Sequence, residues 1–130
     1  MSYYKEFVDI RRDPEHFGLE HVTEFELREP DYSFDTFSLW YHPDECKYYW
    51  AGDSGCSCPS PFEDFGCPVT GDETLDAAEV QEVLDKMGSG DFLDALSAIG
   101  SASWDHDSEY VKDEVRSALE SLVNYEMREN

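Results

Sequence analysis

Two aromatic runs lie close together in the chain, SFDTFSLWY at residues 33–41 and CKYYWA at residues 46–51, with the turn sequence HPDE at 42–45 between them. Aromatic and β-branched residues favour strands, and a Pro-Asp pair between two such runs is typical of a turn. The two runs therefore predict an antiparallel hairpin. Residues 19–29 alternate unevenly between apolar and polar side chains and predict a further strand before the hairpin.

The second half of the chain has helical periodicity. Apolar residues repeat at three- and four-residue spacing in its first helical segment, at Val80, Val83, Leu84 and Met87. We expect a helix over residues 75–87, capped by Thr74 and stopped by Gly88. A short helix that ends at Gly100 and a longer helix capped by Ser108 follow it. Strands followed by helices predict an α+β domain, in which an antiparallel sheet or hairpin packs against about three C-terminal helices.

Length and composition indicate one domain over residues 1–130. We divide it into mainly strands at 1–51, a Cys/Gly/Pro loop at 52–73 and a helical part at 74–130. A chain of this length buries about two thirds of the surface that its unfolded state exposes. The start of the chain lacks the apolar region of a secretory signal, and no stretch approaches the roughly 20 apolar residues of a membrane span. We therefore expect a cytoplasmic protein.

The chain is strongly acidic but rich in apolar residues. It holds 31 Asp and Glu against 9 Lys and Arg, a formal net charge of −22, while 40% of it is hydrophobic and 15% is aromatic. Such a chain can form a core, so it is expected to fold with its charge on the surface. Because an anionic surface is repelled by nucleic acid and anionic lipid, we expect a protein partner with a basic or nucleic-acid-binding surface, and neither nucleic acid nor membrane directly.

The carboxylates of the helical half are spaced along helices. Steps of four residues advance about 6 Å along a helix, which is similar to the separation of successive phosphates on a DNA strand. A row of carboxylates can therefore imitate a row of phosphates, although a solvated face that keeps the protein soluble is the alternative. Trp104 is added as an aromatic anchor. The candidate partner-binding residues are Asp72, Asp76, Glu79, Glu82, Trp104, Glu109, Asp113 and Glu120.

Four cysteines offer a second candidate site. They are Cys46, Cys56, Cys58 and Cys67, with the spacing C-x9-C-x-C-x8-C. Four thiolates can bind zinc tetrahedrally, so a structural zinc is the one cofactor we consider. Zinc ligands usually come as C-x2-C pairs, whereas one residue separates the two central cysteines here. Free thiols in a fixed loop are the favoured alternative, and a disulfide or redox role is the third.

The run YYWAGDSGCSCPSPFE at residues 48–63 resembles the signature of a family of small uncharacterised proteins encoded by bacteriophages of actinobacteria. This resemblance implies a phage origin and places the protein in the cytoplasm of an infected bacterial host. It assigns no catalytic residue to any position of the chain.

Catalytic motifs are lacking. The four histidines are scattered, and no G-x-S-x-G sequence or EF-hand loop is present, so we assign no enzyme activity. Two functions remain open. The first is a phage-encoded interaction protein that inhibits or modulates a host nucleic-acid-binding protein through a DNA-mimicking carboxylate surface. The alternative is a small binding module with a structural metal or a rigid Cys-Pro loop, in which the acidity is incidental.

Overall fold

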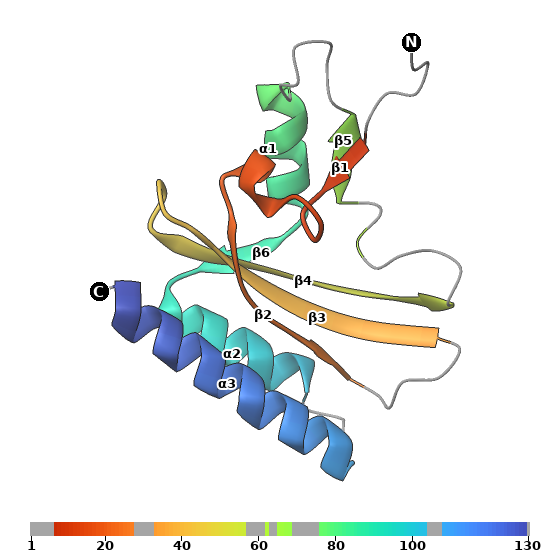
Figure 1. Cartoon of the computed structure of the whole chain (residues 1–130), viewed down its shortest axis with the longest axis vertical. Helices are drawn as coiled ribbons and strands as arrows, with labels where there is room; N and C mark the ends of the chain where they lie inside the picture. Colours follow the sequence, from red (N-terminus) through yellow and green to blue (C-terminus); the bar gives the residue numbers. More distant parts are fainter. Residues whose placement is uncertain are drawn as a thin grey trace.

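A four-stranded antiparallel sheet lies at the centre of the molecule, with two helices on one side and a group of shorter elements on the other (Figure 1). The architecture is α+β, as the sequence predicts. It is seen in a computed structural model, which describes residues 7–27, 33–56, 62, 65–68, 76–103 and 108–129.

The central sheet is built around the predicted hairpin. β3 (Ser33–His42) and β4 (Lys47–Cys56) pair along their whole length and are joined by the predicted turn. β2 (Glu20–Glu26) pairs with the other edge of β3, which confirms the strand expected within residues 19–29. β6 (Gly88–Gly90) pairs with β4, so the strand order is β2-β3-β4-β6.

The loop predicted at residues 52–73 begins later than expected. β4 continues past Ala51 to Cys56, because these residues pair with the first half of β3 and main-chain ladder bonds do not require side chains with strand preference. A short strand, β5 (Gly66–Pro68), also lies within the predicted loop. It pairs with β1 (Phe7–Asp9) in a separate two-stranded sheet.

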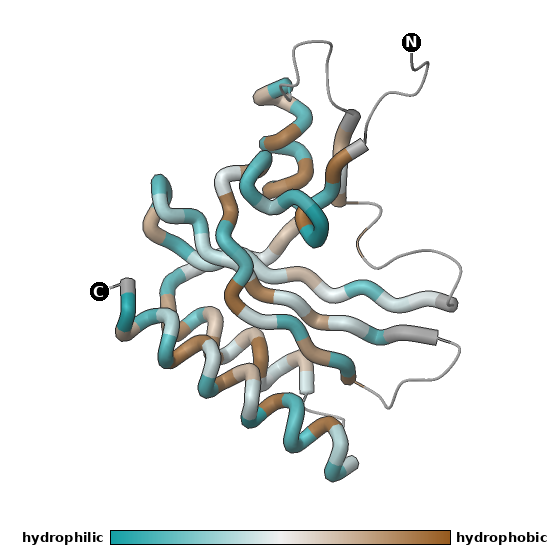
Figure 2. Tube along the Cα trace, viewed as in Figure 1, coloured by the Kyte–Doolittle hydropathy of each residue, from teal (hydrophilic) through white to brown (hydrophobic). Residues whose placement is uncertain are grey.

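Both faces of the central sheet are buried. Successive side chains of a strand point to opposite faces, and β3 has large apolar residues at both odd and even positions. Leu39 and Tyr48 belong to a core shared with two helices, whereas Trp40 and Tyr49 belong to a second core on the other face. Figure 2 shows hydrophobic residues recurring between hydrophilic ones along the strands and helices that form these cores.

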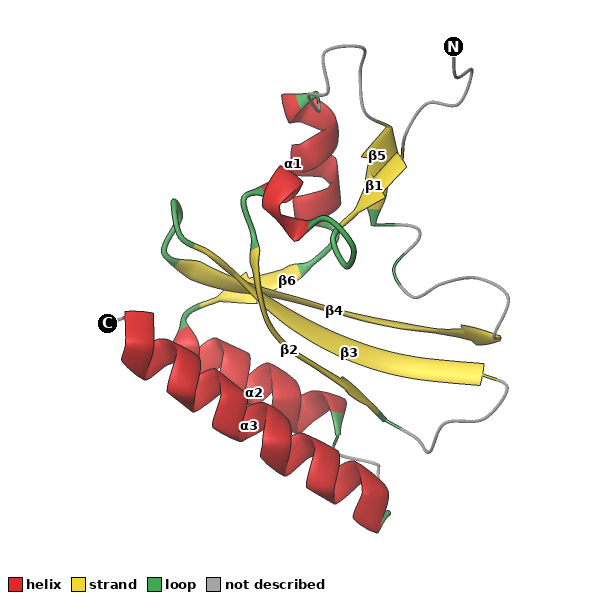
Figure 3. Ribbon diagram, viewed as in Figure 1, coloured by secondary structure: helices red, strands yellow, loops and turns green. Residues whose placement is uncertain are grey.

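Helices cover the two faces of the sheet (Figure 3). α2 (Phe92–Ala102) and α3 (Glu109–Glu129) pack on one face and contribute to its core Ala95, Ile99, Val111, Ala118, Leu122 and Tyr125. The other face is covered by α1 (Ala77–Asp85), the short 3-10 helix η1 (Pro14–Phe17), β1 and β5.

The helix boundaries differ in part from the prediction. The cap of α1 is Asp76, whose carboxylate accepts from the Ala78 amide at 2.8 Å, and the predicted cap Thr74 lies outside the described residues. Gly88 begins β6, and Gly100 lies inside α2, which continues to Ala102. Ser108 does cap α3, because its hydroxyl accepts from the Val111 amide at 3.2 Å. No helix in the described part of the chain has the length and apolar character that crossing a bilayer requires.

Candidate functional site

The predicted carboxylates fall into two groups on opposite sides of the sheet. α1 packs on the core that contains Trp40, while α3 packs on the core that contains Leu39 (Figure 3). The α1 group is Asp76, Glu79 and Glu82, and the α3 group is Glu109, Asp113 and Glu120. Asp72 and Trp104 lie outside the described residues. The sequence leaves open whether these carboxylates form one patch, and the sheet divides the described ones into two.

The α1 group is mostly exposed and lies on a single helix. Asp76 and Glu82 are exposed, and Glu79 is half-buried. Leaving aside Lys86, which follows Glu82 by four residues, no lysine or arginine among the described side chains forms an ion pair with any of the three. Their charge reaches the underlying core, because burial raises the pKa of the Cys67 thiol and the carboxylates of Glu79 and Asp76 raise it further.

The α3 group lies among cations and apolar side chains. Nζ of Lys112 is 3.9 Å from Oε1 of Glu109, and an Arg116 guanidinium nitrogen is 3.9 Å from Oδ1 of Asp113. Glu120 lines a shallow cavity of about 650 Å³ together with these two cations and with Val115, Leu119, Val123 and Asn124. The outer face of α3 is therefore of mixed character and not a row of carboxylates alone.

The two cysteines whose side chains the structure describes lie in different parts of the fold. Cys46 lies in the exposed β3–β4 turn, where its φ is +56° and its thiol donates to the Pro43 carbonyl at 3.4 Å. Cys67 is buried in the core beneath α1, far from that turn (Figure 1). Cys58 and the side chain of Cys56 lie outside the described residues. A zinc ion needs all its sulfur ligands at about 2.3 Å, so the four-cysteine site predicted from the spacing is corrected: Cys46 and Cys67 cannot share one ion in this fold.

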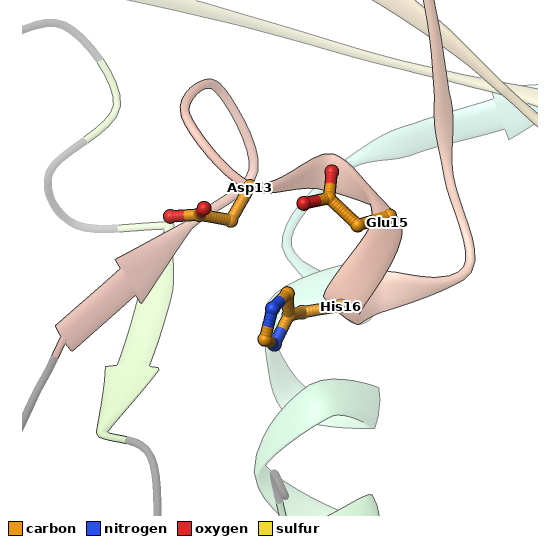
Figure 4. A group of neighbouring side chains, drawn as sticks. All are labelled: Asp13, Glu15 and His16. Carbon is orange, nitrogen blue, oxygen red and sulfur yellow. The ribbon is translucent and has the colours of Figure 1, made fainter. Parts of the chain in front are cut away.

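One group of metal-type donors was missed by the sequence reasoning. Asp13, Glu15 and His16 place one ligand atom each within 4.8 Å of one another around η1 (Figure 4). Pro14 begins this helical turn and brings the three side chains together, so the sequence DPEH at 13–16 is the signal that could have found them. Two carboxylates and an imidazole suit a divalent transition cation. Exposed carboxylate groups are common on a chain of this charge, so the geometry alone does not assign a metal.

The model of one protein family matches residues 8–128, which is most of the chain. That family is described as a Domain of unknown function (DUF7574). No curated protein and no solved structure matches the chain.

Proposed function

Because the chain belongs to the DUF7574 family, a domain of unknown function, we propose a function from its own surface. The protein is an acidic interaction protein that binds the basic, nucleic-acid-binding surface of a host protein and thereby inhibits or modulates it. The resemblance of residues 48–63 to proteins of actinobacteriophages supports the cytoplasm of an infected bacterium as the place where this occurs.

The α1 group carries the proposal. Apart from Lys86, four residues after Glu82, no described cation forms an ion pair with its carboxylates, so lysine and arginine side chains of a partner can pair with them. Asp76, Glu79 and Glu82 are three residues apart, and each step advances about 4.5 Å along the helix. This axial step lies between the axial rise per phosphate of one DNA strand, about 3.4 Å, and the separation of about 6 Å between successive phosphates.

The formal charge supports the same reading. Ordinary solubility requires a net charge of magnitude about 2 to 8 for a small domain, whereas this chain has −22. Association driven by such a field is fast and falls steeply with ionic strength. A partner whose own site normally binds phosphates is the kind of protein that this field attracts.

Affinity capture with matched variants tests the proposal. Tagged protein is used to capture partners from actinobacterial lysate at low and high salt, with and without added DNA, and the captured proteins are identified by mass spectrometry. The first variant removes the α1 charges (Asp76→Asn, Glu79→Gln, Glu82→Gln), and Asn at the first position keeps the helix cap. The control removes three charges from α3 (Glu109→Gln, Asp113→Asn, Glu120→Gln).

We expect the wild type and the α3 variant to capture one nucleic-acid-binding protein that is lost at high salt or with DNA. The α1 variant should capture at least about threefold less of it, since each exposed ion pair contributes about 0.2–1 kcal/mol and three are removed. Capture that is indifferent to salt and DNA, or an equal loss in both variants, would contradict binding through α1.

A second candidate function rests on the segment that follows β4. Oδ2 of Asp53 accepts from the Phe62 amide at 2.8 Å, and the Phe62 ring is fully buried between Trp40 and Phe65. Asp53 and Phe62 are thus joined to each other, and Phe62 is anchored in the core, which supports a binding module built on the Cys-Pro segment. Elemental analysis of protein purified without chelator tests whether this module holds a metal. One equivalent of zinc in the wild type that is lost in the double variant Cys56→Ser/Cys58→Ser would favour this candidate.

A further inference from the structure

A small cavity lies where three elements meet: the β3–β4 turn, the start of α2 and the C-terminal half of α3. Its volume is about 280 Å³. Three aromatic rings, two carboxylates and one exposed leucine dominate its wall, from Tyr41, Tyr48, Phe92, Asp91, Glu126 and Leu93. None of the described residues that line it is a lysine or an arginine.

The aromatic wall is held in place by ring contacts. Tyr41 and Tyr48 are partners across the β3–β4 ladder, and their ring centroids are 4.8 Å apart at an interplanar angle of 60°. Tyr125 of α3 supports both, with its ring centroid 5.5 Å from that of Tyr41 and 6.4 Å from that of Tyr48. The faces of such rings carry negative potential and attract cations.

The carboxylates are also positioned by hydrogen bonds. The Tyr48 hydroxyl donates to Oε2 of Glu126 at 2.5 Å, which holds this carboxylate beside the aromatic rings. Oδ1 of Asp91 caps α2 by accepting from the Asp94 amide at 2.9 Å. Because both groups are fixed before any ligand arrives, little side-chain entropy is lost when a cation binds.

Aromatic faces next to carboxylates are suited to an organic cation, and an apolar residue at the edge is suited to its hydrocarbon stem. Leu93 is 67% exposed, so it presents an unpacked apolar side chain at the cavity. We propose that the cavity binds a lysine side chain of a protein partner, with the ammonium between Glu126 and the aromatic rings and the methylene stem against Leu93. The inference rests on the proposed function in taking the partner to be basic, but it names a site away from α1.

A pair of small probes tests the cavity directly. N-acetyl-lysine amide and its uncharged counterpart N-acetyl-norleucine amide are titrated into the full chain, and backbone amide shifts are followed by NMR. We expect the lysine probe to shift signals around Tyr41, Asp91 and Leu93 in a saturable manner in the millimolar range. The norleucine probe should bind at least twofold more weakly, because it lacks the cation that the aromatic rings and Glu126 attract.

Two variants that each remove one negative charge distinguish binding at this cavity from nonspecific attraction to the acidic surface. Glu126→Gln removes a charge but keeps an acceptor for the Tyr48 hydroxyl, and it should weaken binding of the lysine probe at least fivefold. Glu109→Gln removes the same charge at the other end of α3 and should leave binding unchanged. Equal binding of both probes, or an equal effect of both variants, would overturn the site.

Affinity capture of the partner tests whether the bound lysine belongs to that partner. It also tests the cavity and the DNA-mimicking function separately. If the lysine belongs to the partner, Glu126→Gln lowers capture of the protein recovered by wild type. Unchanged capture would overturn the assignment to the partner, even if the probe binds. If a partner is captured in a manner that depends on salt and DNA, but the lysine probe does not bind, the cavity proposal alone is overturned. If the lysine probe binds, but no such partner is captured, the DNA-mimicking function alone is overturned.

Discussion

A Cβ atom at Gly88 would lie 2.6 Å from Cε2 and 2.7 Å from Cδ1 of the Trp50 ring, and it would also meet Nε1 of that ring. Gly88 is paired with Trp50 across the β4–β6 ladder, so the rigid indole cannot move aside without disturbing this edge of the sheet. We expect Gly88→Ala to lower the free energy of unfolding by about 1–3 kcal/mol, the usual cost of overpacking. Urea unfolding followed by circular dichroism measures it.

Gly100 is the matched control for this substitution. It is exposed within α2, and a Cβ there would meet nothing within 4 Å. Gly100→Ala should therefore raise the free energy of unfolding by about 0.5–1 kcal/mol, because alanine loses less backbone entropy in a helix. A Gly88→Ala variant as stable as wild type would show that β6 does not approach Trp50 as closely as described.

The two glycines also show what single residues leave undetermined. The sequence predicts both as helix ends, yet one permits a close approach between strands and the other lies inside a helix. Glycine, which has no side chain, is compatible with a helix end, with the interior of a helix and with a close approach between strands. Which of these occurs depends on the residues that pack nearby. That neighbour, the Trp50 ring, is distant in the chain and cannot be inferred from the residues beside Gly88.

Between elements, the Tyr48 hydroxyl joins β4 to α3 through Glu126. Burial raises the pKa of Tyr48 well above its ordinary value of about 10, and the hydrogen bond to Glu126 raises it further. The native state thus holds this proton more tightly than the unfolded state does. The corresponding stability is fully present below about pH 10 and is lost as the pH rises above that value.

Tyr48→Phe tests this linkage. At pH 7 the variant should be less stable than wild type by about 1 kcal/mol, because the hydrogen bond to Glu126 is lost. The deficit should shrink at pH 11, because the variant has no phenol to ionise on unfolding. Urea unfolding at the two pH values measures the difference, and a deficit that does not change with pH would mean that Tyr48 is not the group that links the two elements.

Elements specified by local signals were predicted, and elements specified by distant partners were not. The hairpin follows from the residues of its turn. The cap of α3 follows from the Ser108 side chain, which reaches an amide of its own helix. The strands β1, β5 and β6 are three residues each and exist only because their partners come from other parts of the chain. A Gly-Ser-Gly strand has no preference of its own for extended structure.

The division of the candidate surface follows from the same limit. The carboxylate positions on α1 and α3 could be predicted, but their placement on opposite sides of the sheet could not. A signal was present, because Leu39, Trp40 and Tyr41 put large side chains on both faces of one strand. Strands buried on both faces have continuous apolar runs, and such a sheet must be covered from two sides.

For the whole molecule, the net charge of −22 opposes the compact state. The Debye length falls from about 30 Å at 0.01 M salt to about 10 Å at 0.1 M, so added salt screens repulsion across a domain of this size. We therefore expect the melting temperature to rise with salt over this range. Thermal unfolding followed by circular dichroism at the two concentrations measures the change.

The triple variants of α1 and α3 test which helix contributes more to the electrostatic repulsion within the folded protein. Neutralising Asp76, Glu79 and Glu82 removes three charges from a helix whose one described cation is Lys86, so the melting temperature at 0.01 M salt should rise. Neutralising the α3 group also removes the partners of Lys112 and Arg116, so its melting temperature should change less. Both differences should diminish at 0.1 M salt. A wild-type melting temperature that is flat or falls with salt would mean that the carboxylates are spread widely enough not to repel, which would also weaken the case for a concentrated binding surface on α1.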